Sequence, residues 1–135
     1  MANALYDLGR EAFLSGDISW DSDTIKVILV DTGTYTVDLA AHDHLDDIPA
    51  GARVATSDAL ASKTVASGVA DAADITLSTV SGNTVEAVVI YQDTGTEATS
   101  KLIAYIDTAT NLPVTPNGGD ITAQWDNGSN KIFKL

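Results

Sequence analysis

The stretch TVEAVVIYQDTGTEATSKLIAYIDT, residues 84–108, decides the fold class. Two apolar runs, rich in β-branched and aromatic residues, flank a polar centre at the tripeptide Asp-Thr-Gly of 93–95. Such runs are typical of strands, and Asp and Gly are typical of the turn that joins two strands. The stretch therefore predicts a β-hairpin with strands at 84–91 and 101–107.

Other parts of the chain carry the same period-two or β-branched pattern. TIKVILV, residues 24–30, predicts a central strand, and GTYTVDL, residues 33–39, predicts a second strand after a turn. Strands are also expected at 52–57 and, broken by small-residue turns, within 63–80. Strands this short at this spacing favour a mainly β fold, either an antiparallel β-sandwich or a flattened barrel.

The carboxyl end, TPNGGDITAQWDNG at 115–128, holds two Asn-Gly turn signals around an alternating run. In that run Ile121, Ala123 and Trp125 are expected on one face of a strand, because strand side chains alternate. We expect the segment to close a sheet and to deliver the indole to the core or to a seam. A last strand is expected in the terminal KIFKL.

One amphipathic helix is predicted at residues 3–15, with Asn3 as its N-cap and Gly16 at its end. Leu5, Leu8 and Ala12 form its apolar stripe, and Gly9 lies in its middle. Between strands, residues 40–49 are expected to form one helical turn or a loop.

Length and composition favour one domain, residues 1–135, in which 3–15 is the helix and 18–135 the β domain. The chain has no cysteine and no apolar run of the roughly 20 residues that a membrane helix needs. Its net charge is −12, and such a surface repels nucleic acid. We therefore expect neither a nucleic-acid partner nor a membrane. Sixteen of the nineteen acidic residues are Asp, a residue typical of turns and caps.

The two histidines, His42 and His44, both lie in the acidic segment AHDHLDD. The segment could bind a divalent metal through imidazole and carboxylate, but the pattern favours an exposed acidic loop with no such role. The pairs Asp21/Asp23, Asp46/Asp47 and Asp71/Asp74 could hold a weak structural cation, but DISWDSD and DAAD lack the Gly and the closing Glu of a dedicated calcium loop. They are expected to be turns and caps. No phosphate-binding glycine motif and no catalytic motif is present, so we expect no catalytic residues, cofactor or metal and no enzymatic activity.

Both ends of the chain resemble a known family. The opening ALYDLGREAFLSGDISWDSDTIKVILVDTGTYTVD, residues 4–38, and the closing LIAYIDTATNLPVTPNGGDITAQWDNGSNKIFKL, residues 102–135, are similar to small virion proteins of tailed bacteriophages. The likeness covers nearly the whole chain and is weakest at 58–80. It implies a structural protein of the virion, assembled in the host bacterial cytoplasm, and it transfers no catalytic residue.

The resemblance implies partners within the particle: the major capsid protein or other virion subunits, and further copies of the chain. Capsid decoration, in which the protein cements the head, is the first expectation, and a tail, neck or fibre position is the alternative. The assembly surface is expected at the two chain ends, where apolar residues concentrate. They are Leu5, Tyr6, Leu8, Phe13, Ile132, Phe133 and Leu135. The alternative is that the terminal residues pair within their own domain.

Overall fold

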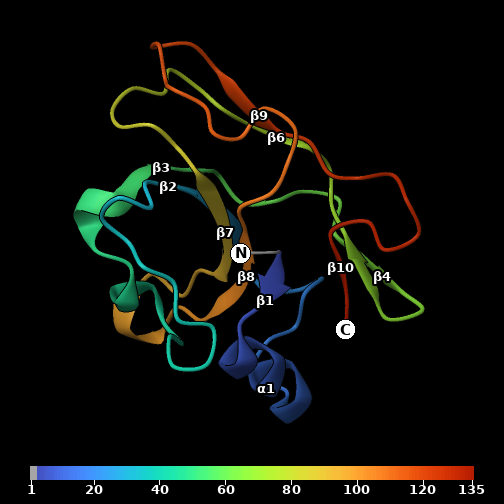
Figure 1. Ribbon diagram of the computed structural model, residues 1–135. Helices are drawn as coiled ribbons and strands as arrows, with labels where there is room; N and C mark the ends of the chain where they lie inside the picture. Colours follow the sequence, from blue (N-terminus) through green and yellow to red (C-terminus); the bar gives the residue numbers. More distant parts are fainter. Residues whose placement is uncertain (1–2) are drawn as a thin grey trace.

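The computed structural model, which describes residues 3–135, is built around a five-stranded antiparallel sheet (Figure 1). Its strand order is β1-β8-β7-β2-β3. The strands are β1 (Ala4–Leu5), β8 (Leu102–Ile106), β7 (Ala87–Gln92), β2 (Ile25–Val30) and β3 (Arg53–Thr56). The predicted antiparallel, mainly β fold is confirmed, while its finer description as a sandwich or barrel stays a prediction.

The centre of this sheet is the pairing of β2 with β7, which runs over six residues of each strand. Alternate residues of β2 enter different cores: Ile25 and Val27 lie on one face, Ile28 and Val30 on the other. All four are fully buried. A strand covered on both faces needs apolar side chains at successive positions, which explains the continuous β-branched run.

The predicted hairpin is confirmed, because β7 pairs with β8 in antiparallel register. Its first strand starts at Ala87 rather than at residue 84, because Val85 forms a bridge with Val114 instead. A short 3₁₀ helix, η3 (Glu97–Thr99), lies in the connecting loop.

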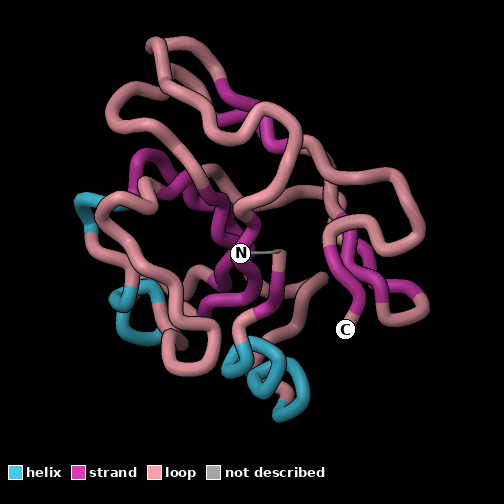
Figure 2. The backbone as a smooth tube through the Cα atoms, viewed as in Figure 1, coloured by secondary structure: helices cyan, strands magenta, loops and turns pink. Residues whose placement is uncertain are grey.

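Two smaller antiparallel sheets complete the strands (Figure 2). One has the order β10-β5-β4, and the other pairs β6 with β9. Their strands are β4 (Thr64–Ala66), β5 (Val69–Asp71), β6 (Ile75–Leu77), β9 (Ile121–Ala123) and β10 (Phe133–Lys134). The two predicted carboxyl-terminal strands therefore exist, and each pairs with a partner from the middle of the chain.

The indole of Trp125 lies in the core, as predicted, with 9% of the residue exposed. Its ring N–H donates to the carbonyl of Ala73, and its backbone N–H donates to the Asp74 carboxylate. The side chain thus ties the segment after β9 to the segment before β6.

The amino-terminal helix, α1 (Asp7–Ser15), is shorter than predicted. Asn3 is not its N-cap: the Asn3 amide donates to the Thr108 carbonyl, and its oxygen accepts from the backbone N–H groups of Asp107 and Thr108. These contacts hold Ala4 and Leu5 as strand β1 against β8. The predicted helix end is confirmed, because Gly16 is the left-handed C-cap.

The segment 33–39 is a loop and not the strand that we predicted. Tyr35 anchors it, because its buried hydroxyl hydrogen-bonds that of Tyr6 at 2.9 Å. Packing of this aromatic side chain over the sheet decides the local structure, against the strand propensity of the segment. Two 3₁₀ helices follow, η1 (Leu45–Asp47) and η2 (Ala50–Ala52), and η1 is the helical turn expected within 40–49.

Candidate functional site: a groove at the chain ends and a polar hollow beside it

The residues predicted to form an assembly surface separate into buried and accessible groups. Leu5 and Tyr6 are 7% and 0% exposed, so the domain's own core buries nearly all of both side chains. Leu8, Phe13, Ile132 and Phe133 are half-buried, and Leu135 is exposed.

Phe133 belongs to the domain's own sheet, in keeping with the alternative in which the terminal residues pair internally. Its backbone is paired with Ala70 of β5, and its ring lies edge-on against Trp20, with 5.3 Å between centroids. Phe13 of α1 lies 5.9 Å from the same ring. This aromatic group joins the two ends of the chain.

A groove of about 200 Å³ runs between these ends. The residues that line it lie in or next to β1, β8, α1 and β10. Two of these residues are basic. The full lining is Asn3, Ala4, Leu5, Arg10, Ala104, Ile106, Ile132, Phe133 and Lys134. Most of this lining is apolar, so the groove offers hydrophobic surface to water between strands from two different sheets.

Two terminal strands border the groove. Within residues 3–135, β1 ends the five-stranded sheet and β10 ends the three-stranded sheet, so each has a strand neighbour on one side alone. In Figure 1, β10 (red) lies next to the green strands around β4, close to the carboxyl terminus. Residues of both end strands therefore line the groove.

Neither basic residue of the groove forms an ion pair with another residue of 3–135. Within residues 3–135, Lys26, Arg53 and Lys131 each lie within 4.0 Å of a carboxylate oxygen. No described carboxylate lies that close to Arg10 or Lys134, although acidic residues outnumber basic ones by 19 to 7. Two unpaired cations in one groove of a strongly acidic protein mark it as an acceptor of negative charge.

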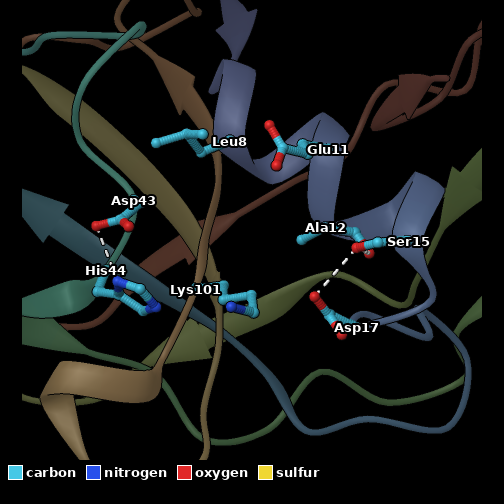
Figure 3. Close-up of a pocket in the computed structure, with 8 residues that line it drawn as sticks. All are labelled: Leu8, Glu11, Ala12, Ser15, Asp17, Asp43, His44 and Lys101. Carbon is cyan, nitrogen blue, oxygen red and sulfur yellow. Dashed lines mark hydrogen bonds and ion pairs between the residues drawn. The ribbon is translucent and has the colours of Figure 1, made fainter.

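A second, smaller hollow of about 130 Å³ lies on the other side of α1 (Figure 3). It is polar and is lined by Leu8, Glu11, Ala12, Ser15, Asp17, Asp43, His44 and Lys101. Figure 3 shows His44 and Asp43 entering from one side, and Ser15 and Asp17 from the other.

The polar groups of this hollow are engaged with their own neighbours. The Nδ1 atom of His44 lies 2.8 Å from an Asp43 carboxylate oxygen. The Ser15 hydroxyl donates to Asp17 at 3.0 Å and to the carbonyl of Ala12 at 3.3 Å. A nucleophile must hydrogen-bond a base in order to be activated, and no contact joins Ser15 to His44 in the described structure. The described contacts of Ser15 therefore do not include a base that would activate it.

The acidic segment AHDHLDD is not the exposed loop that the sequence favoured. His42, Asp43, His44 and Asp47 are half-buried, and Leu45 is buried. The Nδ1 atom of His42 lies 2.8 Å from the Tyr35 hydroxyl, which packs the segment onto the core. The composition of the segment gives no sign of this contact, because the sequence predicted Tyr35 in a strand and the structure has it in a loop.

Three of the six paired aspartates, Asp23, Asp47 and Asp74, accept backbone N–H groups through their carboxylates. Asp47 accepts the backbone N–H groups of Asp43 and His44. Burial would raise the pKa of Asp47, but these donors outweigh burial and hold the pKa below its ordinary value. Asp23 accepts from the Ser19 backbone. In the part of the chain that the structure describes, no group of three or more His, Cys, Asp or Glu residues is placed to hold a metal ion.

Glu86 also caps a turn. Its carboxylate is half-buried and accepts the backbone N–H of Thr32 at 3.0 Å, in the turn that follows β2. The Glu86 carboxylate thus joins the segment before β7 to the turn after β2 through a backbone hydrogen bond.

The two groove cations, Arg10 and Lys134, were absent from the residues predicted for the surface. Their only sequence signal is their position, one near each end of a chain with few bases. None of the helices formed by residues 3–135 combines the length and hydropathy required to cross a bilayer. The sequence matches no family model and no curated protein.

Proposed function

We propose that the protein is a non-enzymatic structural subunit of a tailed-phage virion, and that it decorates and cements the capsid. The observation that carries the proposal is the meeting of the chain ends. The two stretches that most resemble phage virion proteins, 4–38 and 102–135, contribute eight of the nine residues that line the groove between β1 and β10, and Asn3 is the ninth.

The surface chemistry supports a position outside the shell. A net charge of −12 disfavours contact with packaged DNA, and a subunit on the outer surface does not need such contact. The groove, with its apolar lining and its two unpaired cations, is suited to a protein partner. Its partners in the particle would be the major capsid protein and further copies of this chain.

Loss of the gene tests this role against the tail or neck alternative. Without a cement protein, heads should assemble and package DNA but release it at lower temperature than wild-type heads. Without a tail or neck protein, heads should show wild-type thermal stability and fail to join tails. Electron microscopy and a DNA-release assay across a temperature ramp separate the two. Fully normal virions would count against both positions.

A further inference from the structure

Two Asn-Gly sequences lie on the surface of the protein, at Asn117-Gly118 and Asn127-Gly128, and all four residues are exposed. In such a sequence the backbone nitrogen of the glycine can attack the side-chain carboxamide of the asparagine, which closes a cyclic succinimide and releases ammonia. Water then opens the ring at either carbonyl and leaves aspartate or isoaspartate. Glycine favours this reaction because it has no side chain to block the approach and its backbone turns freely. A glycine N–H that is hydrogen-bonded in the folded state is protected until its turn opens.

Hydrogen bonds hold the turn at Asn117 closed. The N–H of Gly118, whose nitrogen would have to attack, donates to the carbonyl of Val80 at 2.8 Å. Val80 is buried, and its own N–H donates back to the carbonyl of Gly119 at 2.9 Å. The side-chain oxygen of Asn117 accepts the N–H of Gly119 at 2.9 Å, which fixes the carboxamide. Both reacting groups are therefore restrained in the folded protein.

The turn at Asn127 has no such restraint. Within residues 3–135, neither the N–H of Gly128 nor the side chain of Asn127 forms a hydrogen bond. Residues 126–131 are all exposed, and their one backbone hydrogen bond joins the Lys131 N–H to the Gly128 carbonyl at the long distance of 3.4 Å. Water can therefore remove the proton from the Gly128 nitrogen, and the carboxamide is free to turn towards that nitrogen.

Both ends of this turn are anchored to the same part of the chain. Before the turn, the indole N–H of Trp125 donates to the carbonyl of Ala73 at 3.1 Å. After it, the backbone N–H of Ile132 donates to the carbonyl of Ala70 at 3.2 Å. Because the turn between these anchors is tied by one long bond, it can take up the extra backbone carbon of isoaspartate without moving them. The reaction would thus add a negative charge just before β10 and leave the fold in place.

We propose that Asn127 is a site of spontaneous covalent modification, at which attack by the Gly128 nitrogen converts the carboxamide to aspartate and isoaspartate, while Asn117 stays intact in the folded protein. The bond from the carboxamide carbon to its nitrogen breaks as the ring bond forms, and the departing nitrogen takes up the proton that Gly128 gives to solvent. Water supplies the atoms for ring opening. The reaction needs only the chain and water, so it goes beyond the assembly role and does not depend on it.

The test is incubation of the full chain in mildly alkaline buffer, followed by trypsin digestion and tandem mass spectrometry at intervals of days. Trypsin releases residues 102–131 as one peptide that holds both sites, and its fragment ions locate the change and distinguish aspartate from isoaspartate. In the folded protein Asn127 should react on the order of tenfold faster than Asn117 or more, because the hydrogen bond of Gly118 has to open first. In urea that unfolds the chain, the two rates should converge.

Variants provide the second arm. Asn127→Gln, whose longer side chain would have to close a larger and less readily formed ring, should abolish the main product. The matched control Asn117→Gln should leave the rate at Asn127 unchanged. Equal rates at the two sites in the folded protein, or a faster rate at Asn117, would overturn the proposal. So would a rate at Asn127 that is far lower in the folded chain than in urea, because the turn would then be held closed.

Discussion

Replacing Gly9 with Ala should destabilise the protein, although Ala is the better helix former. The glycine lies in α1 where the helix crosses β8. A Cβ atom there would lie 2.5 Å from the carbonyl oxygen of Leu102 and 3.2 Å from the Cα of Ile103. Both are backbone atoms of the sheet, so the helix must move away by about 1 Å to restore a contact of roughly 3.5 Å.

The expected loss follows from two opposing terms. Ala in place of Gly favours the helix by about 1 kcal/mol. Overpacking against a rigid neighbour costs about 1–3 kcal/mol, and a 2.5 Å approach to backbone belongs at the upper end. We expect a net loss of about 2 kcal/mol, which lowers the urea midpoint by about 1 M at an m-value near 2 kcal/mol/M.

Urea unfolding measures this loss through tryptophan fluorescence, because Trp20 and Trp125 are both buried in the folded state. The matched control is Gly51→Ala in η2, where an added Cβ meets nothing within 4 Å. The control should be neutral or stabilising by up to about 1 kcal/mol. A Gly9→Ala variant as stable as the wild type would refute the close packing of α1 on β8.

The hydroxyl pair and the carboxyl end lead to further expectations. Tyr6→Phe should lower the free energy of unfolding by about 1 kcal/mol in the same urea assay, because the Tyr35 hydroxyl keeps one other partner. Burial raises the pKa of Tyr35 to about 12, and that of Tyr6 above its ordinary value. The folded state therefore holds these protons more tightly, so the contribution of the two hydroxyls to stability should be complete below about pH 10 and be lost as the pH rises towards 12. Thermal unfolding between pH 9 and 12 checks this, and a flat profile would contradict it. Deleting 132–135 removes the Phe133 ring from Trp20 and should cost about 1–3 kcal/mol while leaving a soluble, folded monomer. An insoluble product would show instead that the segment is indispensable to the core.

The sequence predicted the parts of the fold that depend on neighbouring residues. The hairpin of β7 and β8 and the buried strand β2 are visible as local patterns, and both are confirmed. The pairings of β6 with β9 and of β5 with β10 join segments far apart in the chain. These strands are only two or three residues long, and their sequences do not indicate which strand each one pairs with. The pairings therefore could not be predicted from local sequence.

The amino-terminal helix shows how a tertiary contact changes a local prediction. Asn3 is a good N-cap residue, and the apolar stripe from Leu5 suggested a helix start at residue 3. The side chain instead bonds three backbone groups at Asp107 and Thr108, which extends the main sheet by β1. Gly9 weakened the helix prediction when read alone, whereas in the structure it is what lets α1 approach β8.

The sequence suggested an assembly surface at the two chain ends, and that role stays a prediction. The chain ends do meet in one groove, yet Leu5 and Tyr6 are buried by their own domain. Arg10 and Lys134 were not predicted as groove residues. A basic residue suggests a binding role only when no carboxylate lies close to it in the folded structure. That is a property of the folded chain, and a sequence with 19 acidic residues gives no sign of it.

The copy number of the protein in purified virions tests the central claim most directly. Densitometry of stained gels, normalised to the major capsid protein, gives the number of chains per particle. A capsid decoration protein should be present in numbers comparable to the major capsid protein, because it occupies the symmetry sites of the shell. A count on the order of six or twelve, as expected for a ring at the neck or tail under the same symmetry argument, would contradict capsid decoration. Absence from the particle would contradict the virion role itself.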